Sequence, residues 1–184
     1  MEGKIVFEGL SDKGNKILIR YPTKDDGQIF CDYINILSKE KTFVRFQGEE
    51  VSLEDETKYL NTQLDRISKK QTVELIVFCN NKLIGISSID MKDKTESHEG
   101  VFGISIAKEY RGEGIGKKFM QLVLGEAEKN MPQLRIVTLG VFGNNPLAKS
   151  MYENFGFKEY GRLPKGSLHK GEYVDHIYMY KNVR

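Results

Sequence analysis

The feature that most constrains this chain is a run of alternating glycines in EYRGEGIGKKF, residues 109–119. An apolar stretch, GVFGISIAK, precedes the run and is typical of a strand. The stretch that follows, IGKKFMQLVLGEAEKN, is typical of a helix because its apolar residues recur at helical spacing. Those residues are Ile115, Phe119, Leu122, Val123 and Ala127. Glycine lets a ligand approach the backbone, and a helix N-terminus offers unpaired N–H groups, so the run predicts an anion-binding turn.

Two common phosphate-binding motifs do not fit this run. A Walker loop needs a glycine where Arg111 stands and a serine or threonine where Lys118 stands. A dinucleotide-binding fingerprint needs Gly-x-Gly-x-x-Gly and an acidic residue after the next strand. Here the glycines strictly alternate, and the next apolar stretch, LRIVTLGVF, contains no acid. A nucleotide-binding protein is therefore a distant alternative.

The rest of the chain predicts strands and helices of a single domain over residues 1–184. The predicted order is β-β-α-α-β-β-β-α-β-α-β-β, with a strand pair in residues 1–20, helices in 21–71 and a core in 72–181. This order favours an α/β (mixed α+β) fold with one mixed sheet and helices on both faces.

The pattern of residues 51–70 predicts the second of these helices. Ser52 followed by Asp55 resembles a capping box with Asp in place of Glu. The apolar residues of this segment recur near 3.6-residue spacing and predict its buried stripe. They are Leu53, Tyr59, Leu60, Leu64 and Ile67.

The composition indicates an ordinary globular protein. The net charge of +2 gives no sign of a nucleic-acid or membrane partner. Cys31 and Cys79 are too few for a disulfide framework and are expected to be small core residues. No signal peptide or membrane span is evident, so we expect a cytoplasmic protein. His169 and His176 are not spaced with other ligands, and no metal site is expected.

Two segments carry a family resemblance. Arg111, Gly114 and Gly116 match an Arg-x-x-Gly-x-Gly loop, and residues 145–157, NPLAKSMYENFGF, match a second signature further along the chain. The second match comprises Asn145, Ala148, Tyr152, Gly156 and Phe157, with Met151 in place of Leu. Both motifs resemble those of the GNAT superfamily of N-acetyltransferases, and they stand in the family's order with a strand between them. The resemblance covers about residues 72–181.

The resemblance implies a twisted, mostly antiparallel sheet of about seven strands, about four helices, and a wedge between two splayed strands. It implies acetyl-coenzyme A (acetyl-CoA) as co-substrate, with the loop amides on its pyrophosphate and the preceding strand along its pantetheine arm. The expected cofactor-binding residues are Ile104, Ser105, Ile106, Arg111, Gly112, Glu113, Gly114, Ile115, Gly116, Lys117, Asn145, Ala148, Lys149 and Tyr152. Lys118 is a further phosphate candidate, or a solvated residue of the helix.

Tyr152 is the expected general acid, because a phenol can protonate the departing thiolate. The alternative is that it only packs beside the cofactor. Many relatives place a glutamate base where this chain has Gly100 or Val101, so Glu99 and His98 are the candidate bases. Both are also ordinary residues for an exposed strand end. Transfer of the proton to bulk water is a third route.

The resemblance favours a small acceptor, such as an amino acid or another amine, over a protein N-terminus or lysine. Acetyl transfer is expected to be direct, since no cysteine lies near the loop or Tyr152. Asp90, Tyr173 and Asp175 are candidates for the acceptor pocket. The acidic segment 48–56 has two interpretations. It attracts a cationic amine, or its acids only interact favourably with the dipole at a helix N-terminus. The C-terminal residues 169–181 resemble a hairpin that lines the pocket and joins a homodimer. A non-catalytic acyl-CoA sensor is the alternative from another class.

Overall fold

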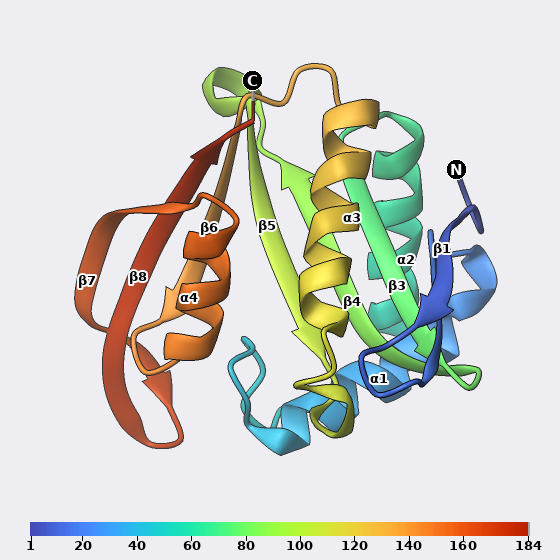
Figure 1. Ribbon diagram of the computed structural model, residues 1–184, viewed down its shortest axis with the longest axis horizontal. Coiled ribbons are helices and arrows are strands. Elements are labelled where there is room, and N and C mark those ends of the chain that lie inside the picture. Colours follow the sequence, from blue (N-terminus) through green and yellow to red (C-terminus); the bar gives the residue numbers. More distant parts are fainter. Residues whose placement is uncertain (184) are drawn as a thin grey trace.

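The structure is a computed structural model that describes residues 1–183; Arg184, the last residue of the predicted domain, lies outside them. The described chain forms one open sheet with helices against both faces (Figure 1). The helices are α1 (Gly27–Glu40), α2 (Leu53–Ser68), α3 (Ile115–Asn130) and α4 (Pro146–Asn154), with short 3-10 turns η1 (Lys24–Asp26), η2 (Lys94–Glu96) and η3 (Lys108–Tyr110). The strands are β1 (Ile5–Leu10), β2 (Lys16–Arg20), β3 (Thr72–Cys79), β4 (Lys82–Met91), β5 (Glu99–Ile106), β6 (Ile136–Phe142), β7 (Lys158–His169) and β8 (Glu172–Asn182).

The sheet has the strand order β1-β2-β3-β4-β5-β6-β8-β7. Among residues 1–183 it therefore contains eight strands, as in the predicted element order and one more than the approximate seven that the family resemblance implies. Neighbouring strands are antiparallel except β5 and β6, which are parallel because α3 carries the chain back across the sheet between them. The predicted fold class, a mixed and mostly antiparallel sheet, is confirmed.

The helices cover the two faces of the sheet unevenly. α3 lies along β3, β4 and β5 on the near face of Figure 1, with α4 beside it, and α2 lies on the far face. The stripe that α2 buries is Glu56, Leu60, Gln63 and Ile67. The predicted stripe was wrong at Leu53 and Tyr59, which are 46% and 42% exposed. The predicted cap of α2 is confirmed, since the Asp55 N–H donates to Ser52 Oγ at 3.1 Å.

The core is continuous across the sheet. Strand β3 is buried on both faces over nearly its whole length, as expected for a strand between two helix layers. Cys31 and Cys79 are buried free thiols, which confirms the prediction that they are small core residues. No helix of the described chain is long and apolar enough to cross a membrane.

The two parallel strands separate after a short contact. In the described chain β5 pairs with β6 only over residues 99–101 and 136–138. Beyond that point residues 139–142 of β6 pair with β8 alone. Figure 1 shows the two strands diverging towards the end where the glycine run lies. This divergence leaves one edge of β5 unpaired inside the sheet.

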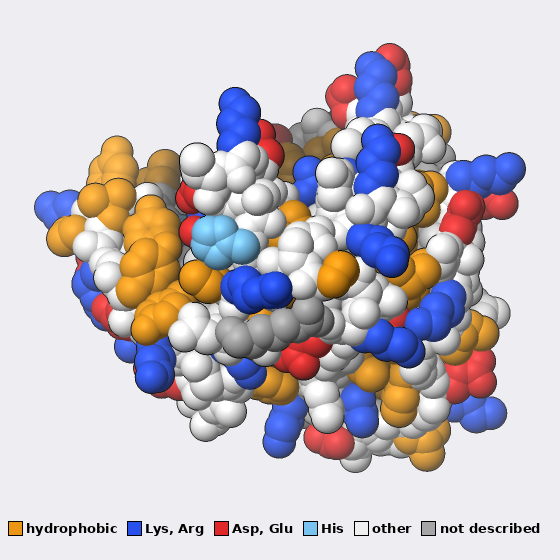
Figure 2. Space-filling view, turned by 90° about the horizontal axis from the view of Figure 1, so that it is seen from above, with side chains coloured by type: hydrophobic (Ala, Val, Ile, Leu, Met, Phe, Trp, Pro, Cys, Tyr) orange, Lys and Arg blue, Asp and Glu red, His pale blue; other side chains and the backbone are white. Residues whose placement is uncertain are grey.

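The β7–β8 hairpin carries several exposed apolar side chains. The Tyr160 ring lies tilted against Tyr178 and edge-on to Tyr180, with ring centroids 6.2 and 5.8 Å apart, and Leu163 and Tyr173 are 51% and 71% exposed. Figure 2 shows hydrophobic side chains gathered at this side of the molecule.

Candidate active site

The glycine run forms a loop of free amides at the start of α3. The N–H groups of residues 112–117 have no hydrogen-bond acceptor in the described chain. The first N–H bonded in the helix is that of Lys118, which donates to the Gly114 carbonyl at 3.1 Å. Gly112 and Gly114 have φ angles of +73° and +71°, a conformation that L side chains rarely adopt. Successive free amides at a helix N-terminus make a site for an anion.

The turn between β1 and β2 packs against the loop and holds it through Glu113. The Glu113 side chain accepts hydrogen bonds from Ser11 Oγ at 2.9 Å and Asn15 Nδ2 at 2.8 Å. The Asp12 N–H donates to the Glu113 carbonyl at 3.0 Å. The hydrogen bonds from Asn15 and Ser11 hold the pKa of Glu113 below its ordinary value. Glu113 therefore faces away from the anion site and anchors the loop.

Arg111 also has a partner within the chain. Its guanidinium donates to the Ile106 carbonyl and to Glu40 Oε2, both at 2.8 Å. These contacts fasten the loop to the end of β5 and to the end of α1. The Arg111 N–H also donates, to the Lys108 carbonyl at 3.3 Å, so the predicted phosphate contact of Arg111 stays a prediction.

The register of β5 decides which of its groups face the wedge. The Ala107 N–H donates to Ile84 at 2.8 Å and Glu99 accepts from Lys92 at 2.9 Å, so odd-numbered residues bond to β4. Because alternate residues face opposite sides, Phe102 and Ile104 direct their backbone groups to the open edge.

The three strand residues predicted to contact pantetheine thus differ in role. Ile104 faces the wedge. Ser105 bonds to β4 through its backbone, and its Oγ lies 3.0 Å from the Tyr33 hydroxyl. The Ile106 carbonyl accepts from Arg111. Phe102 is the residue that the prediction missed.

Tyr152 lies on α4 at the wall of a cleft of about 1180 Å³ that also contacts Phe102, Ile104 and Ser105. Its ring packs edge-on against Phe102, with centroids 6.0 Å apart. Tyr152 is 8% exposed, and its hydroxyl has no hydrogen-bond partner among the described residues. Burial raises its pKa to about 12, so the phenol keeps its proton through neutral pH. The group is available as a proton donor.

The predicted residues around α4 are mostly engaged with their own chain. Asn145 caps α4 by accepting from the Ala148 N–H at 3.2 Å. Lys149 forms ion pairs with Glu159 and Glu153, at 3.1 and 3.4 Å.

The two lysines that follow the loop point to different places. Lys117 lines a groove between α3 and α4, whereas Lys118 lies over the Phe7 ring, 4.9 Å from its centroid. Of the two lysines, Lys117 is therefore the one whose side chain is available beside the loop. Ile115 is buried at the start of the apolar face of α3, and Gly116 faces Met151 of α4.

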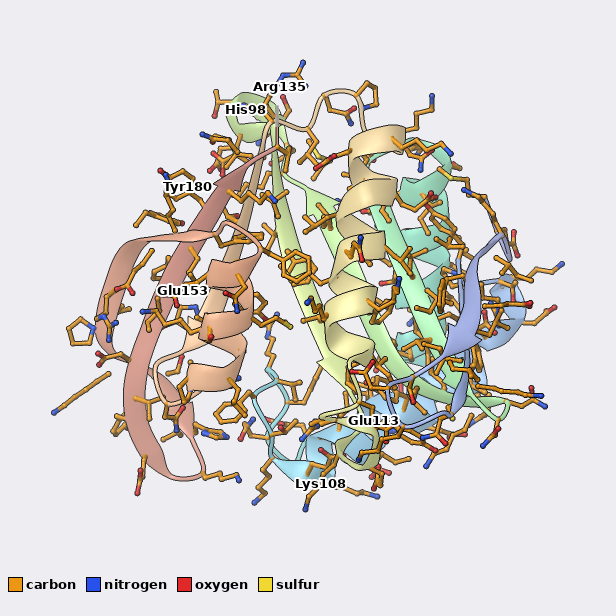
Figure 3. All side chains as sticks on the ribbon, in the orientation of Figure 1. His98, Lys108, Glu113, Arg135, Glu153 and Tyr180 are labelled. Carbon is orange, nitrogen blue, oxygen red and sulfur yellow. The ribbon has the colours of Figure 1, made fainter. Side chains whose placement is uncertain are left out.

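Glu99 and His98, the predicted bases, lie at the far end of β5. Figure 3 shows His98 and Glu113 at opposite ends of that strand. Glu99 is ion-paired with Lys92 at 2.8 Å, and neither candidate lines the cleft. A direct role for either as base stays a prediction that this placement does not favour.

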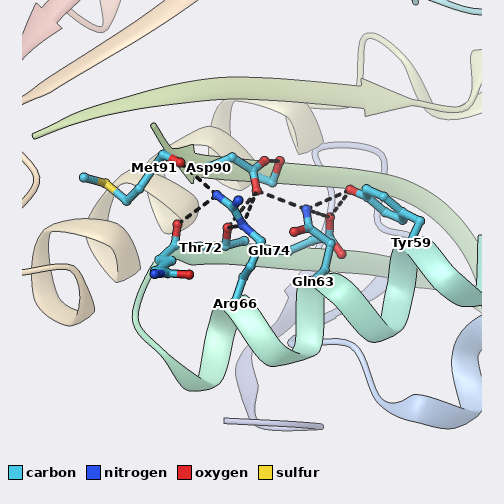
Figure 4. Close-up of polar contacts among 9 residues, drawn as sticks. Tyr59, Gln63, Arg66, Thr72, Glu74, Asp90 and Met91 are labelled. Atoms are coloured by element: carbon cyan, nitrogen blue, oxygen red, sulfur yellow. Dashed lines mark hydrogen bonds and ion pairs between the residues drawn. The ribbon is translucent and has the colours of Figure 1, made fainter. Parts of the chain in front are cut away.

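The other acceptor candidates are also held by neighbours. Asp90 accepts from Thr72, Gln63 and Ser88, as Figure 4 shows in part. Asp175 accepts from Arg162 at 3.1 Å, and Tyr173 is 71% exposed. None of the three predicted residues lines the cleft described above.

The loop between α1 and α2, residues 41–52, covers the cleft opposite Tyr152. Its residues 43–47 line the cleft together with Glu50, Asp55 and Glu56. His169 fastens this loop to β7, since its Nε2 lies 3.2 Å from the Lys41 carbonyl and its ring packs on Phe43 at 4.5 Å.

Three cleft residues were not singled out as site residues from the sequence, although Glu56 ends the acidic segment 48–56 and His176 lies in the predicted pocket hairpin 169–181. Glu56 is 8% exposed and has no side-chain partner in residues 1–183. Arg45 is exposed and likewise forms no ion pair there. His176 packs against Gly140 and bonds Ser167 Oγ at 2.8 Å, and burial lowers its pKa. Arg45 alone of the three lies in no segment that the sequence connected with the acceptor, and the burial of Glu56 follows from its helical spacing with Leu60, Gln63 and Ile67.

Comparison with known proteins points to one family. The chain is 28% identical over 117 residues to the L-amino acid N-acetyltransferase AaaT of Escherichia coli, covering 62% of this chain and 72% of AaaT. A GNAT-family acetyltransferase from Streptococcus pneumoniae superposes with a TM-score of 0.83 at 26% identity, covering 91% of this chain and 99% of the other. The yncA protein of Salmonella typhimurium, solved with acetyl-CoA, superposes with a TM-score of 0.77 at 15% identity, covering 91% and 94%.

The family match spans the residues described above. The model of the acetyltransferase (GNAT) family matches residues 33–157, from α1 through the loop to the end of the second motif. That range contains the free amides of residues 112–117, the open edge of β5 and Tyr152. The chain belongs to the GNAT family and is an acetyltransferase that uses acetyl-CoA as co-substrate.

Proposed function

We propose that this enzyme transfers the acetyl group of acetyl-CoA directly to the primary amine of a small molecule, with an amino acid as the favoured acceptor. The observation that carries the proposal is the run of free amides at residues 112–117 beside the unpaired edge of β5. The loop fits a pyrophosphate, because its amides are free and Gly112 leaves open space where a Cβ would stand. The edge fits an amide-containing arm, because it offers both N–H and C=O groups.

Together these parts set the direction of the bound molecule. A pyrophosphate on the loop and an arm along Phe102 and Ile104 would bring the thioester into the cleft beside Tyr152. Holding both reactants in one cleft lowers the barrier, since the amine then attacks within a bound pair.

Tyr152 acts as the general acid in this proposal. The amine nitrogen forms a bond to the thioester carbon and the C–S bond breaks, while the Tyr152 hydroxyl gives its proton to the departing sulfur. The phenolate then recovers a proton from the nitrogen, so Tyr152 returns to its starting state. Its burial among Phe102 and Phe157 supports this role, because a dry site strengthens the proton transfer.

The class of acceptor is supported by two observations. The cleft wall carries an unpaired anion, Glu56, and an unpaired cation, Arg45, which suit the ammonium and carboxylate of an amino acid. The similar AaaT is named an L-amino acid N-acetyltransferase.

The test is a thiol-release screen with acetyl-CoA over amino acids, amines without a carboxylate, and peptides with free N-termini. We expect turnover on amino acids and a rise in melting temperature with coenzyme A but not with ATP or NAD. Turnover on peptides alone would replace the small acceptor with a protein N-terminus. Tight binding of acetyl-CoA with no thiol release on any amine would favour a sensor domain instead.

The predicted homodimer stays a prediction. The exposed aromatic side chains of the β7–β8 hairpin are the surface on which it would form.

A further inference from the structure

Glu56 differs from the other acids of α2. Glu54 pairs with Lys58, Asp55 accepts from Ser52, and Asp65 pairs with Lys69. Glu56 is the first residue of the buried stripe and is 8% exposed, yet nothing in the described chain pairs with its carboxylate. An unpaired carboxylate at nine-tenths burial is costly for a fold to keep, so its presence on a cleft wall indicates a ligand of opposite charge.

The groups behind Glu56 do not compensate its charge. Glu74 of β3 is fully buried and accepts from Tyr59 at 2.7 Å and Gln63 at 3.3 Å, while its other oxygen has no partner (Figure 4). The nearby guanidinium of Arg66 lies 3.8 Å from Asp90 and donates to the Met91 carbonyl. Arg66, the cation of this network, thus interacts with Asp90 and does not compensate Glu56. The charge on the side of the cleft under α2 therefore stays acidic.

We propose that Glu56 receives the ammonium group of the acceptor and takes its proton. This inference rests on the proposed function, because it assigns the base of that reaction. The N–H bond of the ammonium breaks and the proton forms an O–H bond on Glu56, which leaves a neutral amine to attack the thioester. After transfer Glu56 releases that proton to solvent. Burial raises the pKa of Glu56, which makes it a better proton acceptor than an exposed carboxylate.

The titratable and charged groups around Glu56 support an acid–cation contact. The charge of Glu56 contributes to the raised pKa of the Cys31 thiol of α1 and of Glu74 of β3, for both of which burial is the largest cause. The cleft also contains Glu50 and Arg45 from the loop, Asp55 of α2, and His176 from β8.

His176 is the rival base within the cleft. One nitrogen of its ring already bonds Ser167, and the ring lies against Gly140. It is a neutral group that needs no ligand, whereas Glu56 is buried without a partner. The placement therefore favours Glu56.

The first experiment measures steady-state kinetics of Glu56→Gln, Glu56→Asp and Asp65→Asn with the best acceptor of the screen. We expect Glu56→Gln to lower kcat/KM for the amine about 100-fold or more, as for loss of a general base, with the KM for acetyl-CoA within about twofold. Glu56→Asp should recover part of that loss. Asp65→Asn, an exposed acid of the same helix, should behave as wild type. The wild-type pH profile of kcat/KM should have an acid limb that Glu56→Gln removes.

The second readout is stability in the absence of any substrate. Because the folded pKa of Glu56 is raised, its ionisation lowers the stability of the wild type as pH rises through the interval between its ordinary and its folded pKa. Glu56→Gln removes that loss, so above this interval the variant should melt at a higher temperature than wild type. A lower melting temperature would show that Glu56 has a structural partner and would overturn the inference.

The outcomes separate the inference from the proposed function. If no amine releases thiol with the wild type, the proposed function fails. If amines are acetylated but Glu56→Gln has unchanged kcat/KM, the inference alone fails. A loss of the acid limb in His176→Gln instead of Glu56→Gln would transfer the base to His176.

Discussion

The two walls of the cleft differ in how their polar groups are satisfied. On the cofactor side, the side chains of Arg111, Glu113 and Lys149 are bonded to their own chain, and the backbone amides of residues 112–117 are left free. On the acceptor side, the side chains of Glu56 and Arg45 are left free, and the backbone of the covering loop is held by His169.

Under the proposed function, this difference means that the two ligands are recognised in different ways. Backbone amides suit a ligand that is the same throughout a family, because they do not depend on the side chain at each position. Unpaired side chains suit the ligand that distinguishes one member from another, because a single substitution changes their charge. The following predictions test this division, from the largest expected effect to the smallest.

Tyr152→Phe should lower kcat about 100-fold or more, since the departing sulfur loses its proton donor. The residue lies between the two walls, so the KM values for acetyl-CoA and for the amine should each stay within about twofold. Steady-state kinetics with both substrates varied will measure this. Unchanged turnover would make Tyr152 a packing residue. Because burial raises the pKa of Tyr152 to about 12, the wild-type kcat should not fall with rising pH below about pH 10 through loss of this proton.

Arg45→Gln should change only the acceptor side. For an amino acid we expect KM to rise about tenfold or more, as for loss of a hydrogen bond to a charged group. For an amine without a carboxylate, and for acetyl-CoA, KM should change less than about twofold. An equal rise in KM for amines with and without a carboxylate would contradict the proposal that Arg45 binds the carboxylate of the acceptor.

Gly114→Ala should change only the cofactor side. A Cβ there would stand 2.3 Å from an Asp12 carboxylate oxygen, on a residue with φ of +71°. We expect the free energy of unfolding to fall by about 1–2 kcal/mol and the KM for acetyl-CoA to rise several-fold. Gly125→Ala is the matched control, because its Cβ would meet open space on an exposed face of α3. That change should raise the free energy of unfolding by about 1 kcal/mol, and urea denaturation will compare the two.

Glu113→Gln should give the smallest effect, and one that depends on pH. The folded pKa of Glu113 lies below its ordinary value of 4.5, so its ionised form stabilises the fold above that value. This contribution is lost as pH falls through the folded pKa. The melting temperature of wild type should therefore exceed that of the variant at pH 7, and the difference should shrink in acid. A difference that is constant with pH would contradict the role of the charge.

Much of the fold could be predicted because local signals agreed with it. The glycine run, the apolar face that begins at Ile115 and the second motif fixed the strand–loop–helix unit and its family. The buried face of α2 was predicted less well. Leu53 and Tyr59 are apolar yet exposed, while Glu56 and Gln63 are polar yet buried. Apolar periodicity cannot identify a buried helix face on which some of the buried side chains are polar.

The parts of the candidate site that the sequence indicated are the loop backbone and Tyr152, which both belong to the two motifs. Which groups of β5 face the wedge depends on its pairing with β4, and that register is a long-range property. The predicted bases, Glu99 and His98, are close to the loop in sequence. The cleft, however, is closed by residues from α1, α2 and β8. Such residues come together only through the sheet order.

The hairpin of β1 and β2 lies outside residues 33–157, yet its turn holds Glu113 from beneath. The first twenty residues therefore support the loop by direct contact, although the family model does not include them. Lengthening that turn by a single residue would shift the position of Glu113, and we expect the affinity for coenzyme A to change although the residues of the loop itself are unaltered. Sequence drift in this remote hairpin is thus a route by which cofactor affinity can be tuned.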